Sequence, residues 1–261
     1  MASTGRAKRP SNLEIGVPTE YNFALARQRF DKTMPHVGSG AQSLLDVGCG
    51  NGANTVLFAT AVPKVAGVDV EPERLSTARE FARQHGLDNV EYVISDGLNI
   101  PYPDDSFDYV TCFDVLEHVD DEEKTLSEID RVLRPGGKLA ISVPNKWYLM
   151  EIHGFQFKPE FVPWNRVPLL SWLPTPIHER YAHARIYTKR RILSILRQAG
   201  FEVLAHEYAM PPFDRVGRPW LRRLLVTLFS SLAHTPLKVI GLRHFIIAVP
   251  PVTAIQSART P

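Results

Sequence analysis

The chain has 261 residues, of which 44% are hydrophobic and 22% are charged, and its formal net charge is +2. This length and apolar content favour one α/β domain with a full core and exclude a fibrous or wholly disordered chain. Its two cysteines, Cys49 and Cys112, do not suggest a disulfide framework and fit a reducing compartment.

The N-terminal segment is expected to lie outside the folded unit. Residues 1–17 are polar and basic and show no hydrophobic periodicity, so we predict them to be disordered. They contain no apolar stretch typical of a secretory signal, and we therefore expect a cytoplasmic protein. A helical pattern follows over about residues 19–34 and carries Arg27 and Arg29.

A glycine-rich loop follows the first predicted strand. The apolar run 43–47 predicts a buried strand, and glycines then stand at alternate positions, Gly48 and Gly50 among them, before a helical pattern over 53–61. Glycines let the backbone turn sharply and approach a ligand closely, and a helix start presents free N–H groups. The spacing also satisfies a relaxed nicotinamide fingerprint. However, Asp46, two residues before the first glycine, favours a ligand with a cationic end.

Acidic residues follow the next two predicted strands. The strand at 65–68 ends in Asp69, 19 residues after Gly50, where a carboxylate can accept both ribose hydroxyls of an adenosine. The strand at 90–94 ends in Ser95-Asp96-Gly97, which could meet the adenine amino group.

Strand and helix patterns alternate along the rest of the chain, which predicts a parallel, doubly wound sheet. Further strands are predicted at 107–113, at 138–143, from Phe201 and at 244–249, and helices at 72–85, at 121–133 with Asp120 as cap, and at 188–199.

This ordered series of motifs resembles the class I S-adenosylmethionine-dependent methyltransferases, especially the methyltransferase type 11 group that includes the ubiquinone-biosynthesis O-methyltransferases. The match covers roughly residues 40–145. The resemblance implies a Rossmann-like sheet of seven strands, mostly parallel, with the last strand inserted antiparallel, and S-adenosyl-L-methionine as cofactor. It also implies a single domain over 18–261 with substrate-covering insertions at about 146–187 and 211–243.

The resemblance implies a set of cofactor contacts. Asp46 would hold the amino group through water or the loop backbone, and Asp69, next to Val70, would take the ribose hydroxyls. Phe113 would lie beside the methionine moiety. The adenine would be framed by three consecutive residues, Asp96, Gly97 and Leu98. An arginine of the leading helix, Arg27 or Arg29, either meets the cofactor carboxylate or lies on a solvated helix face.

The stretch Asp114-Val-Leu-Glu117-His118 is the candidate catalytic segment. It resembles the Glu-x-x-Glu-His of the ubiquinone O-methyltransferases, where three side chains hold a divalent ion. Here the first position is the shorter Asp, so a metal is not favoured. Three roles remain for His118: general base, which we favour because imidazole titrates near neutral pH, metal ligand, or structural histidine. The covering segment offers three alternative bases: His153, His178 and His183.

Charge and tryptophan are unevenly distributed. Residues 1–144 hold 14 Lys/Arg and 22 Asp/Glu, a balance of −8, whereas residues 145–261 hold 16 and 6, a balance of +10. The basic half suggests an anionic partner, either a substrate or a membrane surface. All four tryptophans lie in the two insertions. These insertions are either ordinary core-packing loops or an apolar pocket or membrane-facing rim. The apolar run at 221–233 is too short to span a bilayer.

The sequence therefore predicts an S-adenosylmethionine-dependent methyltransferase acting on a small or lipid-linked acceptor, more at oxygen than at nitrogen or carbon. Phe113-Asp114-Val115-Leu116 stands where amine-modifying relatives carry Asn-Pro-Pro-Tyr. No nucleic-acid partner is expected, and a peripheral membrane contact is an alternative to a wholly cytoplasmic protein. A nicotinamide-dependent oxidoreductase and a non-catalytic cofactor-binding module remain open.

Overall fold

A computed structural model of the chain describes residues 24–38, 40–153, 155–157, 160–162, 168–213 and 216–250. The segment predicted to be disordered, 1–17, and the first part of the helix predicted at 19–34 lie outside these ranges.

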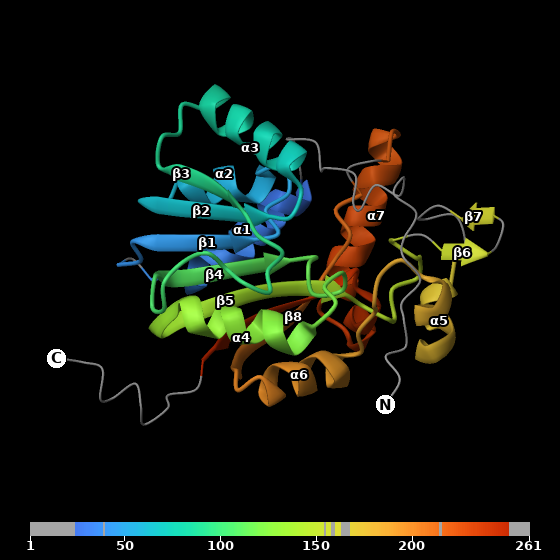
Figure 1. Cartoon of the computed structure of the whole chain (residues 1–261). Coiled ribbons are helices and arrows are strands. Elements are labelled where there is room, and N and C mark those ends of the chain that lie inside the picture. Colours follow the sequence, from blue (N-terminus) through green and yellow to red (C-terminus); the bar gives the residue numbers. More distant parts are fainter. Residues whose placement is uncertain are drawn as a thin grey trace, which may run out of the picture.

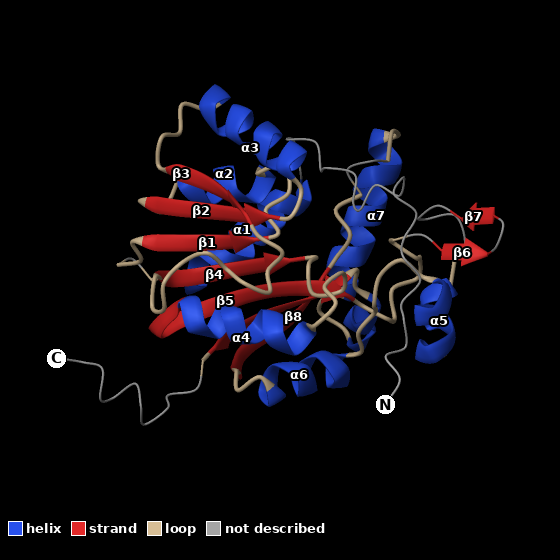
Figure 2. Ribbon diagram, viewed as in Figure 1, coloured by secondary structure: helices blue, strands red, loops and turns tan. Residues whose placement is uncertain are grey.

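A seven-stranded sheet forms the centre of the molecule (Figure 1, Figure 2). Its strand order is β3-β2-β1-β4-β5-β9-β8, and β9 runs antiparallel to β5 and β8 while the pairs from β3 to β5 are parallel. The strands are β1 (Ser43–Val47), β2 (Lys64–Asp69), β3 (Val90–Ile94), β4 (Phe107–Phe113), β5 (Leu133–Pro144), β8 (Glu202–Ala209) and β9 (Arg243–Val249). This arrangement confirms the predicted doubly wound fold with its antiparallel last strand.

Helices cover both faces of the sheet. One face is covered by α1 (Ala24–Thr33), α2 (Ala53–Ala59) and α3 (Pro72–Gln84), and the other by α4 (Glu122–Val132) and α6 (Lys189–Gln198) (Figure 2). β1 is buried along its whole length, as expected for a parallel strand with both faces covered. Leu44 packs with Phe58 of α2, whereas Leu45 packs with the residues of α4. Because side chains alternate along a strand, Asp46 lies on the α2 side with Leu44.

Two boundaries differ from the sequence-based expectation. The N-cap of α4 is Asp121, not Asp120: it has extended backbone angles and its side chain accepts a hydrogen bond from the Lys124 amide at 2.9 Å. β5 is longer than the predicted 138–143, because Leu133 already pairs with Phe107 before an irregular step in the register. Both differences depend on backbone angles, which the residue pattern does not fix.

The two segments predicted as insertions contain additional elements. The first holds β6 (Phe155–Phe157), β7 (Glu160–Val162) and α5 (Thr175–Tyr181), and the second holds α7 (Pro219–Leu232) and the 3₁₀ turn η3 (Pro236–Ile240). These elements lie beyond the carboxyl ends of the central strands (Figure 1). Within the described ranges, every helix is too short or too polar to cross a membrane.

Candidate active site

The strand order reverses between β1 and β4, because the chain runs outward from β1 to β3 and then returns to β4 on the other side of β1. In open α/β sheets, ligands bind at this switch point, outside the carboxyl ends of the strands. The glycine loop leaves β1 here and the segment 114–121 leaves β4 here. The topology therefore brings the predicted cofactor loop and the predicted catalytic segment to one place.

Two glycines of the loop serve different purposes. Gly48 and Gly50 both have positive φ, 69° and 55°. A Cβ on Gly48 would lie 2.1 Å from Val115 Cγ2, so the segment after β4 packs directly against the loop. A Cβ on Gly50 would meet nothing within 4 Å. Gly48 is thus needed for packing within the protein, whereas the space beside Gly50 is open to a ligand.

Asp69, at the end of β2, is bound to the loop. Its Oδ2 accepts a hydrogen bond from the Gly50 amide at 2.9 Å, and its Oδ1 accepts one from the Glu71 amide at 3.0 Å. Each carboxylate oxygen has capacity for a second bond, so Asp69 can still accept ribose hydroxyls. Val70, the next residue, is 58% exposed at the same edge.

Asp46 lies beneath the loop rather than on its surface. It is 1% exposed and accepts hydrogen bonds from the hydroxyls of Thr55 on α2, at 2.7 Å, and Thr111 on β4, at 2.8 Å. Burial raises the pKa of Asp46 to about 6, although both hydrogen bonds favour the charged form. Because Asp46 is buried, it could interact with a cofactor amino group only through the loop backbone or a water molecule, which is the arrangement that the family resemblance implies.

The remaining predicted cofactor residues flank the loop. Asp96 is exposed and its Oδ1 accepts a hydrogen bond from the Leu98 amide at 2.9 Å, while Gly97 between them is buried with φ 78°. Phe113 ends β4 and packs against Phe245, with 6.1 Å between ring centroids.

The structure distinguishes the two candidate arginines of α1. Arg27 is exposed and pairs with Asp31 at 3.0 Å, so it lies on the solvated face. Arg29 is buried, places its guanidinium 5.2 Å from the ring centroid of Phe113, and binds Asp114. Arg29 is therefore the arginine that faces the predicted site.

Asp114 lies between two arginines, and the group of possible metal ligands among the described residues does not include it. It has φ 58° and accepts hydrogen bonds from Arg29 and, at 2.6 Å, from Arg243 Nε at the start of β9. Burial alone would raise the pKa of Asp114, but the charges of Arg243 and Arg29 hold it below its usual value. The residue pattern gave no signal for this contact, because Arg243 is 129 positions away.

A buried carboxyl group and two histidines meet beside Asp114. Among the described residues, neither oxygen of the fully buried Glu117 has a hydrogen-bond partner; His153 Nε2 lies 3.6 Å from its Oε1. The rings of His118 and His153 meet edge to face with centroids 5.1 Å apart. Burial, then the charge of Asp114, raises the pKa of Glu117 well above its usual value. Burial, then the proximity of His118, lowers the pKa of His153 well below its usual value.

Burial therefore favours the neutral forms of both the Glu117 carboxyl group and the His153 imidazole. One ligand atom from each of Glu117, His118 and His153 lies within 4.8 Å of the others, so these three could hold a divalent cation. The third candidate ligand beside Glu117 and His118 is therefore His153, where the sequence had suggested Asp114.

Glu151 fixes the position of His153. Its Oε1 accepts hydrogen bonds from the amides of Ile152, at 3.0 Å, and His153, at 2.9 Å, and its Oε2 lies 2.6 Å from Nε2 of the buried His178. Of the three alternative bases from the covering segment, the structure places His153 against His118. His178 is one contact further away, and His183 is half-buried. Glu151 stands two residues before His153, but no motif in the sequence connects it with His178, 27 positions away.

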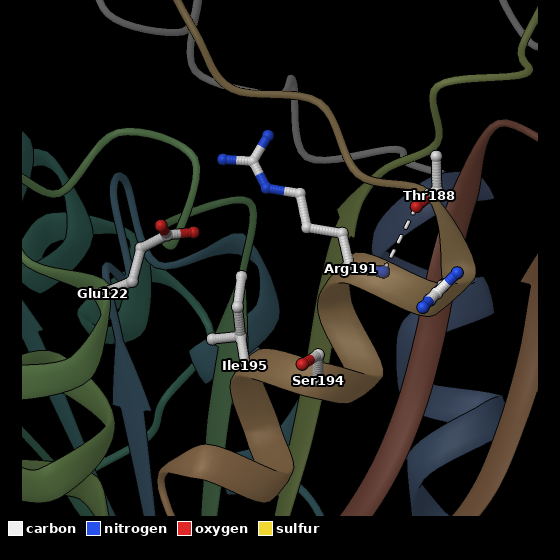
Figure 3. A pocket seen from close by; sticks show the side chains of 6 residues that line it. Glu122, Thr188, Arg191, Ser194 and Ile195 are labelled. Atoms are coloured by element: carbon white, nitrogen blue, oxygen red, sulfur yellow. Dashed lines mark hydrogen bonds between the residues drawn. The ribbon is translucent and has the colours of Figure 1, made fainter.

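A hollow between α4 and the start of α6 does not belong to this site (Figure 3). Its lining includes Glu122, which accepts a hydrogen bond from the Tyr187 hydroxyl at 2.6 Å, and Arg191, which binds Glu179. Glu122 and Arg191 are thus paired within the protein, and no predicted cofactor residue lines the hollow.

A switch point with a glycine loop after β1 and a carboxylate at the end of β2 defines an α/β protein that binds an adenosine-containing cofactor. A family model described as a methyltransferase domain matches residues 45–141. Demethylmenaquinone methyltransferase of Listeria monocytogenes is 31% identical over 181 residues, 63% of this chain and 71% of that protein. The chain therefore belongs to the S-adenosylmethionine-dependent methyltransferases, whose cofactor is S-adenosylmethionine.

Other relatives match over shorter stretches. Ubiquinone biosynthesis O-methyltransferase of Aeromonas salmonicida is 34% identical over 129 residues, 48% of this chain and 54% of that protein. Relatives that share 35–39% identity are matched over only 35–39% of their own length. Among solved structures, the [4+2]-cyclase SpnF has a TM-score of 0.60 at 24% identity, covering 88% of this chain and 82% of that one. That similarity shows the fold alone.

Proposed function

We propose that this protein transfers a methyl group from S-adenosylmethionine to a hydroxyl oxygen of a small or lipid-linked acceptor. Bound S-adenosylmethionine supplies an electrophilic methyl group, so the protein must align the acceptor oxygen with it and remove the hydroxyl proton. The observation that carries the proposal is the cluster of the buried Glu117 with the half-buried His118 and His153 beside the cofactor loop, which offers a proton acceptor at the switch point.

The proposed cofactor contacts follow the geometry of the loop. Asp69 and Val70 meet the ribose, Phe113 lies beside the methionine moiety with Arg29 behind it, and the backbone at Gly48 and Gly50 leaves room for the cofactor. Asp46 supports the amino group indirectly through the loop. The adenine lies against Asp96, Gly97 and Leu98.

His118 is the proposed general base. It is half-buried and lies in the turn that follows β4, next to His153. An ordinary imidazole is neutral and proton-accepting at neutral pH. His118→Ala should lower kcat by about 10²- to 10⁴-fold and leave the affinity for S-adenosylhomocysteine unchanged. His85→Ala, at the end of α3, is the matched control.

Two considerations support oxygen as the acceptor atom. The chain lacks the Asn-Pro-Pro-Tyr motif after β4, and a matched relative is named an O-methyltransferase. Another relative is named an N-methyltransferase and one solved neighbour a cyclase, so neither family nor fold determines the reaction.

The test begins with calorimetric titration of the protein with S-adenosylhomocysteine and with NADH. Binding of the first alone separates a methyltransferase from a nicotinamide-dependent oxidoreductase. Mass spectrometry of co-purifying small molecules then supplies acceptors for turnover assays, and an absence of turnover with every acceptor favours a non-catalytic module. Activity that EDTA abolishes and magnesium or zinc restores would assign Glu117, His118 and His153 to a metal instead of a base.

A lipid-linked acceptor would be met at a membrane surface. A cytoplasmic protein with a peripheral membrane contact is therefore part of the proposal, and the basic C-terminal half supports it.

A further inference from the structure

Helix α7 presents two apolar stripes. Leu221, Leu225 and Phe229 are half-buried, and the Phe229 ring packs against Phe213 with 4.9 Å between ring centroids. Trp220 and Leu224, by contrast, are 63% and 57% exposed, and Leu228 is 50% exposed one turn further on. Residues four apart lie on the same side of a helix, so these three form a continuous exposed stripe. The first stripe is thus partly covered by the protein, whereas the second stripe has no cover among the described residues.

The surroundings of the exposed stripe are positively charged. Arg218, Arg222 and Arg223 are exposed at the start of α7, and Lys238 is exposed in η3. The sequence from 216 to 250 contains no aspartate or glutamate. Exposed tryptophan and leucine beside arginine, without acidic residues, is typical of helices that lie in the interface of an anionic bilayer.

The attachment of α7 places this surface at the edge that carries the candidate active site. The chain leaves β8 at Ala209 and returns into β9 at Arg243, both at the carboxyl edge of the central strands. Asn145 Nδ2, just after β5, donates to the carbonyls of Val239 and Gly241 at 2.7 Å each. Figure 1 shows α7 standing beyond these strand ends.

We propose that α7 is a membrane-docking helix that lies in the headgroup region of an anionic bilayer, with Trp220, Leu224 and Leu228 against the acyl chains. Arg223, one turn after Trp220, lies at the lipid phosphates, and Arg222, on the opposite side of the helix, adds to the positive charge that attracts the bilayer. Docking in this orientation presents the carboxyl edge of the sheet to the membrane. The docking helix rests on the proposed function, whose lipid-linked acceptor and peripheral membrane contact it extends by naming the element that meets the bilayer. A second copy of the chain is a poorer occupant, because a symmetric contact would bring the arginines of two copies together.

The test is co-sedimentation of the full chain with vesicles of phosphatidylcholine, with and without phosphatidylglycerol. We expect binding to the anionic vesicles only, weakened at high salt because mobile ions screen exposed charges. Arg222→Glu with Arg223→Glu, and separately Trp220→Ser with Leu224→Ser, should each weaken binding by roughly tenfold or more.

Matched controls carry the same chemical changes elsewhere. Arg190→Glu with Arg197→Glu alters two exposed arginines of α6, and Leu204→Ser alters an exposed leucine of β8; both should bind vesicles like the wild type. Unchanged affinity for S-adenosylhomocysteine shows that each variant is folded.

Three results would overturn the proposal: no binding by the wild type, equal losses in the α7 variants and the controls, or a dimer that Trp220→Ser with Leu224→Ser dissociates. Failure here and failure of the proposed function are distinguishable. Methylation of a soluble acceptor without vesicle binding rejects the docking helix and the peripheral membrane contact but leaves the methyl transfer standing, and vesicle binding without any methyl transfer rejects only the activity.

Discussion

Three aspartates near the switch point lie in different chemical environments because their hydrogen-bonding partners differ. Asp46 is bound by two hydroxyls and buried, and its pKa is raised to about 6. Asp69 is bound by two backbone amides at the edge of the loop. Asp114 lies between two guanidinium groups, and its pKa is lowered. Only Asp69 combines a position at the loop with spare acceptor capacity, so the ribose role fits it better than the other two.

Asp69→Ala should therefore weaken binding of S-adenosylhomocysteine by at least about tenfold, since hydrogen bonds to charged groups are worth roughly 1.5–3 kcal/mol each. Part of the loss reflects the Gly50 amide, which also loses its partner. Asp69→Asn retains one acceptor oxygen and should lose less. Calorimetric titration measures both, with Glu73→Ala on α3 as control. An unchanged dissociation constant in Asp69→Ala would remove this residue from the site.

Glu151 should act on catalysis through the position of His153. Glu151→Ala removes the acceptor of two amides and of His178, and should lower kcat more than about tenfold and the free energy of unfolding by about 1–3 kcal/mol. Glu151→Gln can accept the amides and donate to His178, so kcat should remain within about tenfold of wild type. If Glu151→Gln were as inactive as Glu151→Ala while remaining folded, the negative charge of Glu151, and not the position it gives His153, would be what catalysis requires.

At the scale of elements, the strands were predictable because each central strand is an apolar run with both faces covered. The cap of α4 was not, since Asp120 and Asp121 both satisfy the sequence pattern and only backbone angles distinguish them. The site was predictable only in part. The loop and the segment after β4 carry local motifs, whereas Arg243, Glu151 and His153 reach the cluster through tertiary packing that leaves no spacing in the sequence.

The contact between the glycine loop and the segment after β4 can be tested directly. Gly48→Ala should lower the free energy of unfolding by about 2–4 kcal/mol, through its positive φ and the clash with Val115. Adding Val115→Ala to Gly48→Ala should recover the part of the unfolding free energy that the clash removes. Denaturant unfolding of the two single variants and the double variant measures the coupling free energy between the two positions. Additive changes in the free energy of unfolding would show that the two segments do not pack against each other.

Gly50→Ala provides the comparison, because its Cβ enters open space. It should cost only the φ penalty of about 1–2 kcal/mol but should weaken cofactor binding more than its effect on stability explains. Gly50→Val should be worse, because a β-branched side chain fills more of that space.

At the scale of the whole molecule, the acidic and basic halves of the sequence form different parts of the structure. The acidic half supplies β1 to β5 and the cofactor loop, and the basic half supplies the covering elements and the antiparallel edge of the sheet. Arg243 and Arg29 reach Asp114 from opposite ends of the chain. The surroundings of Asp114 are thus completed by a residue of the last strand, β9.

That antiparallel edge contains a histidine pair that should make stability depend on pH. His244 on β9 binds the Tyr187 carbonyl through Nε2 at 3.0 Å, so its Nδ1 accepts from His206 Nε2 on β8 at 2.9 Å. Burial, then the charge of Lys189, lowers the pKa of His206 to about 4, and burial lowers that of His244 to about 4. Protonating His244 at Nδ1 removes the acceptor and leaves two donors facing each other.

Because both pKa values are lower in the folded state, the unfolded chain binds more protons as pH falls below about 6.5. The stabilisation is therefore complete above pH 6.5 and is lost between about pH 6.5 and 4, with up to about 3 kcal/mol from the fully buried His244 alone. His206→Gln retains a donor to Nδ1 without a titrating group, so its unfolding free energy should fall less steeply over this range. The exposed His234→Gln should follow the wild type. Denaturant unfolding at half-unit pH steps measures the slopes, and equal slopes in wild type and His206→Gln would show that the pair does not govern acid stability.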